Sequence, residues 1–290
     1  MLGRGSKIPS IRSAALRAVI IFDADNTLWD TNAVFRQAQL DMLRVFGRAG
    51  LLADEEHQLG VLRAVDRELI SQLRRFEYDF RVLSTALAIY YSRASSIEEA
   101  VQRTVRLGGD ALSPRLLPLV EEAYQSFEEG LRAIPPLFPD TEATLTAVHA
   151  SKADDCEVAV LVFSDGNSTR LDRILQAHNI RSRRIFDEII IGTKSAESFE
   201  EAKLSGLRHL PNSGGLLQTT FVMIGDSLQR DVKFGNQAGF ITVYKPADFL
   251  GQEKPHKPDE EPDFTISTLN DLLPILHNMG LPANQPARTQ

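Results

Sequence analysis

The chain contains the run Val19-Ile20-Ile21-Phe22-Asp23-Ala24-Asp25-Asn26-Thr27, in which four apolar residues lead directly into an acidic, polar sequence. An uninterrupted apolar run of this length is typical of a strand buried on both faces of a parallel sheet. Ligands bind at the carboxyl ends of such strands, so Asp23 and Asp25 stand where a site would form. Two carboxylates in one site favour one ionised and one protonated group. The pair therefore suits a nucleophile beside a general acid or base, or a divalent metal site; an acidic turn that caps a helix is the simpler alternative.

Similar apolar runs return along the chain and alternate with helical patterns. The predicted strands are Val19–Phe22, Val158–Phe163, Ile185–Ile191, Phe221–Ile224 and Ile241–Tyr244. The predicted helices between them are Thr141–Ala150, Thr169–His178, Ala196–Leu210 and Gln229–Ala238. This alternation predicts an α/β fold with a doubly wound, mostly parallel sheet.

One long region contains no convincing strand. The helices predicted within it are Ala33–Phe46, Glu55–Arg75, Asp79–Arg93, Ile97–Leu107 and Pro114–Ile134. Several of their ends carry recognisable signals, such as the capping box from Ser96 to Glu99 and the proline that follows Ser113. The expected organisation is an α/β core of residues 18–30 and 139–278 with an all-helical insert of residues 31–138. Residues 1–17 are expected to form a flexible basic tail, and residues 279–290 a C-terminal tail.

Two further strand ends are also polar. The second strand runs into Ser164, Asp165 and Gly166, where a hydroxyl and backbone amides could hold an oxyanion; a helix N-cap explains these residues as well. The carboxylate of Asp165 would have to point away from a bound anion. The fourth strand runs into Asp226 and, five positions later, Asp231, and carboxylate oxygens of this kind suit Mg²⁺.

Lys194 follows the third predicted strand. A lysine at a strand end that faces an acidic cluster would hold phosphate charge and restrain a nucleophile. Taken alone, it is a solvated surface lysine.

Together these residues resemble the four motifs of the haloacid dehalogenase-like (HAD) superfamily of phosphotransferases. The matching residues are Asp23-x-Asp25-x-Thr27-Leu28, Ser164, Lys194 and Gly225-Asp226-Ser227-x-x-x-Asp231, in this order. Asn26 stands where many members have glycine. Lys194 is not followed by the Pro-x-Pro sequence that often comes after the family's lysine. Lys203 therefore stays open as a less favoured candidate for that lysine. The helical insert after the first motif is similar to the family's C1-type cap, which closes over the site and admits small substrates.

The resemblance implies a magnesium-dependent phosphatase that works through an aspartyl-phosphate. Asp23 would attack the phosphorus, and Asp25 would protonate the leaving alcohol and later deprotonate the attacking water. Mg²⁺ would be held by the Asp23 carboxylate, the Asp25 backbone carbonyl and Asp226, with Asp231 assisting. The phosphate would be held by Ser164, Lys194 and the backbone amides around Asp165 and Gly166.

Other activities of the superfamily can be weighed from single residues. Dehalogenases of this type lack the second aspartate, so the presence of Asp25 argues against dehalogenation. Phosphonoacetaldehyde hydrolases need a cap lysine for an imine, and there is none between Thr31 and Phe138. A sugar-phosphate mutase and a non-catalytic HAD-like binding protein stay open. The substrate also stays open among nucleoside monophosphates, sugar phosphates and phosphoglycolate-like acids, and Arg170 is a weak candidate for a substrate contact.

Composition restricts the partners. Across 290 residues, Lys plus Arg is 32 and Asp plus Glu is 39, giving a net charge of −7, which argues against a nucleic acid polymer. No apolar run approaches the roughly 18 residues that span a bilayer, so no membrane partner is predicted.

Cys156 is the single cysteine, which excludes an intramolecular disulfide and fits a cytoplasmic location. Residues 1–17 lack the apolar segment of a secretory signal, while a targeting segment of another kind stays open. The expected partner is a small phosphorylated metabolite, and no obligate protein partner is inferred.

Overall fold

The computed structural model describes residues 17–74, 78–92, 94–151, 156–181, 183–211, 219–247 and 254–281. The predicted basic tail, except for Arg17, lies outside these residues, as does the predicted C-terminal tail beyond residue 281. Arg17 is the first residue of strand β1 and donates hydrogen bonds to Glu157 and to the carbonyl oxygen of Pro211. The chain divides into two compact units, of which one comprises the residues up to Asp30 and from Pro136 onward and the other comprises Thr31–Pro135.

The first unit contains a six-stranded sheet in the order β3-β2-β1-β4-β5-β6, and every neighbouring pair is parallel. The strands are β1 Arg17–Phe22, β2 Glu157–Ser164, β3 Glu188–Ile191, β4 Thr219–Gly225, β5 Ile241–Tyr244 and β6 Phe264–Thr265. Every residue of β1 is buried, because this strand lies at the centre of the sheet with helices on both sides. The predicted doubly wound α/β fold is confirmed.

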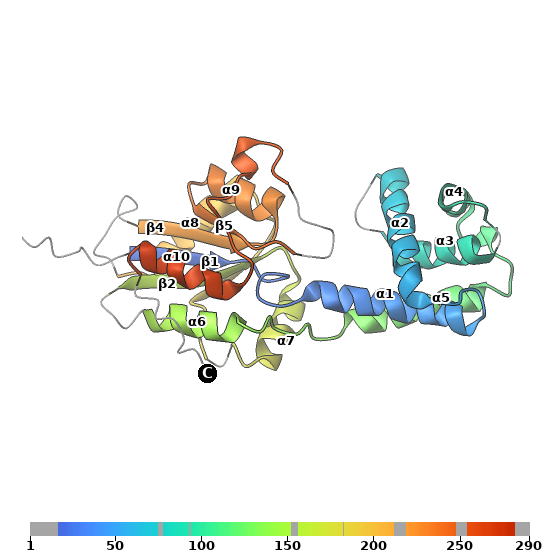
Figure 1. The fold of residues 1–290 in the computed structure, drawn as a ribbon, viewed down its shortest axis with the longest axis horizontal. Helices are drawn as coiled ribbons and strands as arrows, with labels where there is room; N and C mark the ends of the chain where they lie inside the picture. Colours follow the sequence, from blue (N-terminus) through green and yellow to red (C-terminus); the bar gives the residue numbers. More distant parts are fainter. Residues whose placement is uncertain are drawn as a thin grey trace, which may run out of the picture. The chain divides into compact units, whose positions relative to one another are not determined.

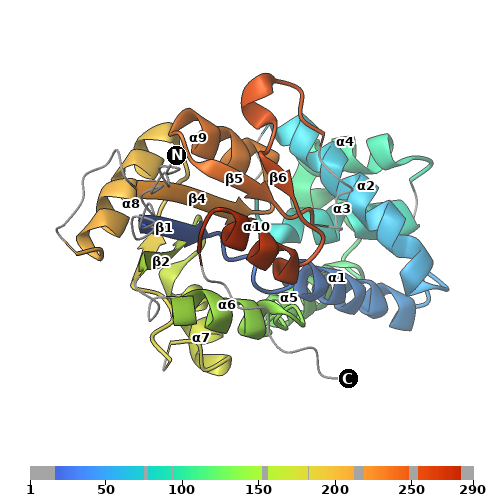
Figure 2. The ribbon, with the colours of Figure 1, turned by 60° about the vertical axis from the view of Figure 1, so that its left-hand side comes forward.

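Helices cover both faces of this sheet (Figures 1 and 2). One face carries α8 (Ala196–Arg208) and α9 (Lys233–Gln237), and the other carries α6 (Thr141–Ala150), α7 (Ser168–Ala177) and α10 (Leu272–Asn278). Because side chains alternate along a strand, Val19 and Ile21 share one core with Phe199 of α8. Gly206 of α8 has no room for a Cβ against Val19, so this helix packs closely on β1.

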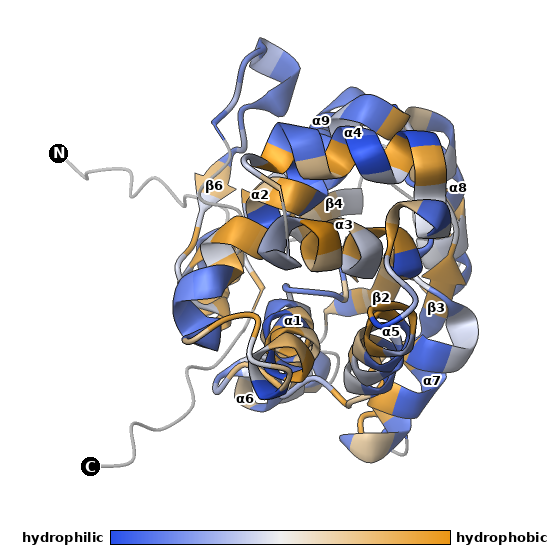
Figure 3. Ribbon diagram, turned by 90° about the vertical axis from the view of Figure 1, so that its right-hand side faces the viewer, coloured by the Kyte–Doolittle hydropathy of each residue, from blue (hydrophilic) through white to orange (hydrophobic). Residues whose placement is uncertain are grey.

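The second unit is all-helical and is inserted between β1 and β2, as predicted. Its helices are α1 Thr31–Arg48, α2 Glu55–Leu73, α3 Phe80–Ser92, α4 Ile97–Leu107 and α5 Leu117–Leu131, with a 3₁₀ turn at Gly108–Ala111. Helices α1 and α5 lie side by side (Figure 3), and Gly130 of α5 approaches Ala38 of α1 too closely for a Cβ. Phe46 and Phe127 are fully buried in the apolar core that these helices share.

Three predicted elements differ most from the structure. Strand β3 begins at Glu188 rather than Ile185. Just before it, the amide of Val160 donates to the side chain of Asp187 at 2.8 Å. The last cap helix begins at Leu117 rather than Pro114, because the preceding residues form a turn closed by a bond from Leu116 N to Ser113 O.

The third difference concerns the predicted helix Gln229–Ala238. It consists of a π-helical turn, Leu228–Val232, followed by α9. The carbonyl of Ser227 accepts from the amides of both Asp231 and Val232, at 2.9 and 3.1 Å, which widens the turn. The sequence predicts neither strand β6, whose two residues form no readable pattern, nor the short helix α10.

Within the described residues, no helix is both long enough and apolar enough to cross a bilayer.

Candidate active site

The carboxyl end of β1 fixes the first aspartate. Asp23 continues the strand, and its amide donates to the carbonyl of Ile224 in β4 at 2.8 Å. The hydroxyl of Thr27 donates to Asp23 Oδ2 at 3.2 Å. Only 6% of Asp23 is exposed, so its carboxylate is largely shielded from bulk water.

A tight turn after Asp23 carries the second aspartate. Asn26 has a φ of +59°, and its amide donates to the carbonyl of Trp29 at 2.8 Å. This left-handed conformation suits glycine and asparagine, which explains why Asn26 can stand where the family often has glycine. Lys245, which directly follows β5, donates from Nζ to the Asn26 carbonyl at 3.1 Å and lies over the ring of Phe138.

The carboxylate of Asp25 has contacts different from those of Asp23. The indole Nε1 of Trp29 donates to Asp25 Oδ1 at 2.9 Å. Arg170 Nη1 lies 2.9 Å from Oδ1 and 3.1 Å from Oδ2 of the same carboxylate. The turn therefore separates the two carboxylates into different electrostatic surroundings, one beside an arginine and one beside a buried lysine.

Lys194 is that buried lysine, with 5% of the residue exposed. Its Nζ donates to Asp23 Oδ1 and to Asp231 Oδ1, the latter at 2.6 Å. Burial opposes its charge, but Asp23 and Asp231 together raise the pKa of Lys194 above its ordinary value. Lys203, the sequence alternative, instead pairs with Glu200 at 3.0 Å and lies over two phenylalanine rings. The structure thus brings Lys194, and not Lys203, to the aspartates.

Asp226 and Asp231, from the end of β4 and the π-helical turn, complete an acidic cluster with Asp23. One ligand oxygen from each of the three lies within 4.8 Å of the others. Burial, with repulsion from Asp231, raises the pKa of Asp23 to about 7 despite the opposing effect of Lys194. Burial and Asp23 likewise raise the pKa of Asp226 well above its ordinary value.

The cluster has the chemistry of a divalent cation site. Lys194 pairs with two of the three carboxylates, Asp23 and Asp231, so the cluster keeps uncompensated negative charge, and its candidate ligand atoms are all oxygens. Hard cations prefer such ligands, and a bound cation would remove the cost of burying this charge. Asp231 has a partner at each carboxylate oxygen. Oδ1 accepts from Lys194 Nζ, and Oδ2 accepts from the amide of Ser227 at 3.0 Å.

The loop after β2 places the predicted phosphate-binding residues. Ser164 is buried, and its Oγ accepts from the amide of Gly166 at 3.0 Å. A Cβ on Gly166 would lie 3.1 Å from Ser164 Oγ and 3.6 Å from Asp25 Oδ2, so this glycine lies between the two groups. The loop and the Asp25 carboxylate therefore belong to one site.

The side chain of Asp165 is engaged by other protein groups, as a phosphate-binding role of its backbone would require. Its Oδ1 accepts from the amide of Lys194 at 2.7 Å, and its Oδ2 pairs with Arg230 at 3.1 Å. A carboxylate bound in this way fixes the backbone of Lys194 and does not offer a donor to phosphate. Only the backbone of Asp165 remains a candidate for that role.

Three residues that contact the site were not among the predicted catalytic, phosphate-binding or metal-binding residues. Trp29 and Lys245 were not singled out, and Arg170 was weighed only as a possible substrate contact. Lys245 carried a readable signal, because it directly follows an apolar strand at the carboxyl edge of the sheet. Trp29 and Arg170 carried none, because their contacts with Asp25 exist only in the folded chain.

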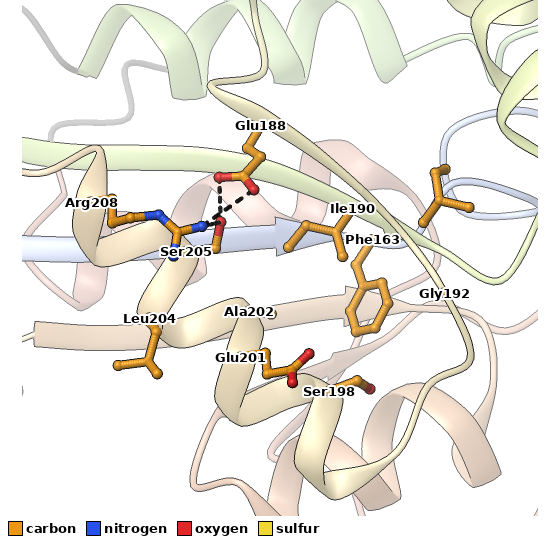
Figure 4. A pocket seen from close by; sticks show the side chains of 11 residues that line it. Phe163, Glu188, Ile190, Gly192, Ser198, Glu201, Ala202, Leu204, Ser205 and Arg208 are labelled. Atoms are coloured by element: carbon orange, nitrogen blue, oxygen red, sulfur yellow. Dashed lines mark hydrogen bonds and ion pairs between the residues drawn. The ribbon is translucent and has the colours of Figure 1, made fainter.

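A separate pocket of about 390 Å³ lies between β3 and α8 (Figure 4). It is lined by apolar side chains such as Phe163, Ile190 and Leu204, with Glu188 and Arg208 at its polar side. The lining contains none of the aspartates of the cluster, so this pocket is not the candidate active site.

Comparison with known proteins places the site in a family. A model described as haloacid dehalogenase-like hydrolase matches residues 18–239, which include every site residue except Lys245. Human N-acylneuraminate-9-phosphatase is 25% identical over 265 residues, covering 90% of this chain and 94% of that protein. Glyceraldehyde 3-phosphate phosphatase of Methanopyrus kandleri is 23% identical over 263 residues, covering 90% and 97%.

Solved structures share the fold. The HAD-hydrolase YfnB of Bacillus subtilis bound to magnesium is 17% identical, with a TM-score of 0.54 over 90% of this chain and 99% of that chain. A haloacid dehalogenase-like hydrolase of Xanthomonas campestris is 19% identical, with the same TM-score of 0.54 over 92% and 96%. The helical insertion between β1 and β2 is consistent with a C1 cap. The sheet order, the aspartates at its carboxyl edge and the matched segment agree, and the chain belongs to the haloacid dehalogenase-like hydrolase family.

Proposed function

We propose that this protein is a Mg²⁺-dependent phosphatase that hydrolyses a small sugar phosphate through an aspartyl-phosphate on Asp23. The observation that carries the proposal is the buried group of Asp23, Asp226, Asp231 and Lys194, with the carboxylate of Asp25 held separately beside it. This arrangement supplies a nucleophile, a proton carrier and compensation for phosphate charge in one place.

Asp23 is the proposed nucleophile. Its oxygen forms a bond to phosphorus while the bond from phosphorus to the substrate oxygen breaks, which gives an aspartyl-phosphate and the free alcohol. Attack requires the ionised carboxylate, and Lys194 stabilises that form through its hydrogen bond to Oδ1. The same lysine restrains the carboxylate, since it is anchored on Asp231 as well.

Asp25 is the proposed general acid and base. In the first step it gives its proton to the departing alcohol oxygen, and in the second it takes a proton from the water that attacks the aspartyl-phosphate. The second attack breaks the bond between phosphorus and Asp23, releases phosphate and restores both carboxyl groups. The position of Gly166 beside Asp25 Oδ2 supports this role, because it places the proton carrier beside the phosphate loop.

The cation would be held by the carboxylates of Asp23 and Asp226 and by the backbone carbonyl of Asp25, with Asp231 assisting. When bound, Mg²⁺ supplies the positive charge that lets an anionic nucleophile approach an anionic phosphate. The Ser164 hydroxyl, the backbone amides of Asp165 and Gly166, and Lys194 would hold the phosphoryl oxygens.

The substrate class is proposed from the relatives. N-acylneuraminate-9-phosphatase and glyceraldehyde 3-phosphate phosphatase are both named for phosphates of small sugar-type molecules, and each is covered over more than nine-tenths of its length. A screen of phosphorylated metabolites with the purified protein tests this class.

We further propose a cytoplasmic location, which fits a chain with one unpaired cysteine, Cys156.

The proposal is tested by rapid quench with labelled substrate on two variants. Asp23→Asn should show background activity and no bound label, because a carboxamide is a far poorer nucleophile. Asp25→Asn should lose about 10²- to 10⁴-fold in rate on alkyl phosphates and retain label on the protein, because dephosphorylation also needs this group. Glu200→Gln, an exposed acid on α8, is the matched control. Label bound to Asp23→Asn, or full activity in EDTA, would overturn the proposal.

A further inference from the structure

Arg170 and Asp25 form a close pair at the candidate active site. The guanidinium Nη1 is within hydrogen-bond distance of both carboxylate oxygens, at 2.9 and 3.1 Å, although the residues are 145 positions apart in the chain. The side chains are 33% and 29% exposed, so the pair forms part of the wall of the site rather than of the core. The chemistry proposed above gives Arg170 no role.

The other side of the carboxylate is anchored in the core. Trp29 is fully buried, and its indole donates to Asp25 Oδ1 at 2.9 Å, the oxygen that also faces Arg170 at 2.9 Å. Two donors from different segments of the chain restrain a carboxylate better than one. Oδ2 then lies on the side of Gly166 and the phosphate loop.

Arg170 is itself tied to that loop. Asn167 caps helix α7, and its Oδ1 accepts from the amides of Thr169 and Arg170 at 2.9 and 3.2 Å. Asn167 directly follows Gly166, so the loop that would bind phosphate and the arginine that contacts Asp25 belong to one short segment held by this cap. A shift of the loop therefore shifts the arginine with it.

We infer that Arg170 is a positioning residue for proton transfer: it holds the Asp25 carboxyl so that Oδ2 points at the oxygen of the departing alcohol. The inference rests on the proposed role of Asp25 as the acid. A displaced acid loses much of its effect, because proton transfer depends steeply on geometry. Arg170 acts through Asp25 and makes no contact of its own with the substrate.

The experiment compares two leaving groups. An alkyl phosphate needs a proton on its departing oxygen, whereas the nitrophenolate of nitrophenyl phosphate departs without one. The ratio kcat/KM reports phosphoryl transfer to Asp23 and not the later hydrolysis. Arg170→Gln should lower kcat/KM for the alkyl phosphate by about 10- to 100-fold, comparable to the loss from misplacing a catalytic group. For nitrophenyl phosphate it should change kcat/KM by less than about threefold, since no acid assistance is lost.

Two further variants separate positioning from folding. Arg170→Lys keeps a donor within reach of the carboxylate and should recover part of the alkyl-phosphate activity. Arg170→Gln combined with Asp25→Asn should be no slower than Asp25→Asn alone, because the acid that Arg170 positions is already gone. Arg173→Gln removes the same charge from an exposed position one turn further along α7 and should match the wild-type protein.

The outcomes are distinct. An equal loss for both leaving groups would show a substrate-binding arginine and overturn the positioning role. A further loss in the double variant would overturn it as well. If the wild-type protein hydrolyses neither substrate with Mg²⁺, the proposed function itself fails, and this role fails with it.

Discussion

The Asp165 carboxylate accepts a hydrogen bond of 2.7 Å from the backbone amide of Lys194. This contact joins the loop after β2 to the segment after β3, and it fixes the point from which the lysine side chain reaches Asp23. Asp165 is thus an acidic residue in a loop proposed to bind phosphate, and its carboxylate is bound to an amide and to Arg230 instead of lying open.

Asp165→Ala should reduce activity by displacing Lys194. The substitution removes the acceptor for the Lys194 amide and the partner of Arg230, so we expect a loss of about tenfold in kcat/KM, corresponding to one lost charge-assisted bond. Asp165→Asn keeps an acceptor and should lose less. Steady-state kinetics with Mg²⁺ measures both variants, and an alanine variant as active as the wild-type protein would refute the link between these two residues.

Lys194→Met should destabilise the protein as well as inactivate it. Removing one partner of a buried ion pair leaves uncompensated charge, which costs about 3–5 kcal/mol. Mg²⁺ should restore more stability to this variant than to the wild-type protein, because the cation replaces part of the lost positive charge. The measurement is urea unfolding in EDTA and in Mg²⁺.

Lys203→Met is the control for that experiment, because Lys203 pairs with one exposed carboxylate, Glu200, and methionine can fill the space beside Phe221 and Phe240. It should unfold at nearly the wild-type urea concentration. Equal stability of Lys194→Met and Lys203→Met in EDTA would contradict the ion-pair network around Asp23.

Asp23 should make stability in EDTA depend on pH. In the folded protein burial raises its pKa to about 7, whereas an unfolded aspartate has a pKa of 3.8. Between these values the folded state binds the extra proton, so the free energy of unfolding decreases as the pH rises. Asp23→Asn should therefore gain stability relative to the wild-type protein between pH 5 and about pH 8. Urea unfolding at both pH values in EDTA measures the difference, and a pH-independent difference would contradict the raised pKa.

Asn26 should tolerate glycine but not alanine. Its φ of +59° costs an ordinary L-residue about 1 kcal/mol or more, whereas glycine adopts this conformation freely. Asn26→Gly should keep the wild-type stability and activity. Asn26→Ala should be less stable and less active, because the same turn carries Asp25. Thermal unfolding and kcat/KM for an alkyl phosphate provide the comparison, and equal behaviour of the two variants would show that the turn is not strained.

Five of the six strands and the residue types at the carboxyl edge of the sheet could be read from the sequence. The apolar runs before Asp23, Ser164 and Asp226 could be read because burial on both faces leaves a continuous local pattern. The long helical insert was readable for the same reason, since capping residues and periodicity act within a few positions. The resemblance to known motifs also depends on short local spacings such as Asp23-x-Asp25.

The individual contacts between these residues depend on the fold. Lys194 and Asp23 are 171 positions apart, and although Lys194 follows a predicted strand, only the fold shows that it, and not Lys203, contacts Asp23. The structural use of the Asp165 carboxylate and the contact of Arg170 with Asp25 likewise join different strand ends. Hydrogen bonds and ion pairs between distant segments leave no periodic trace in a sequence, because they depend on the packing of parallel strands that brings their carboxyl ends to one edge.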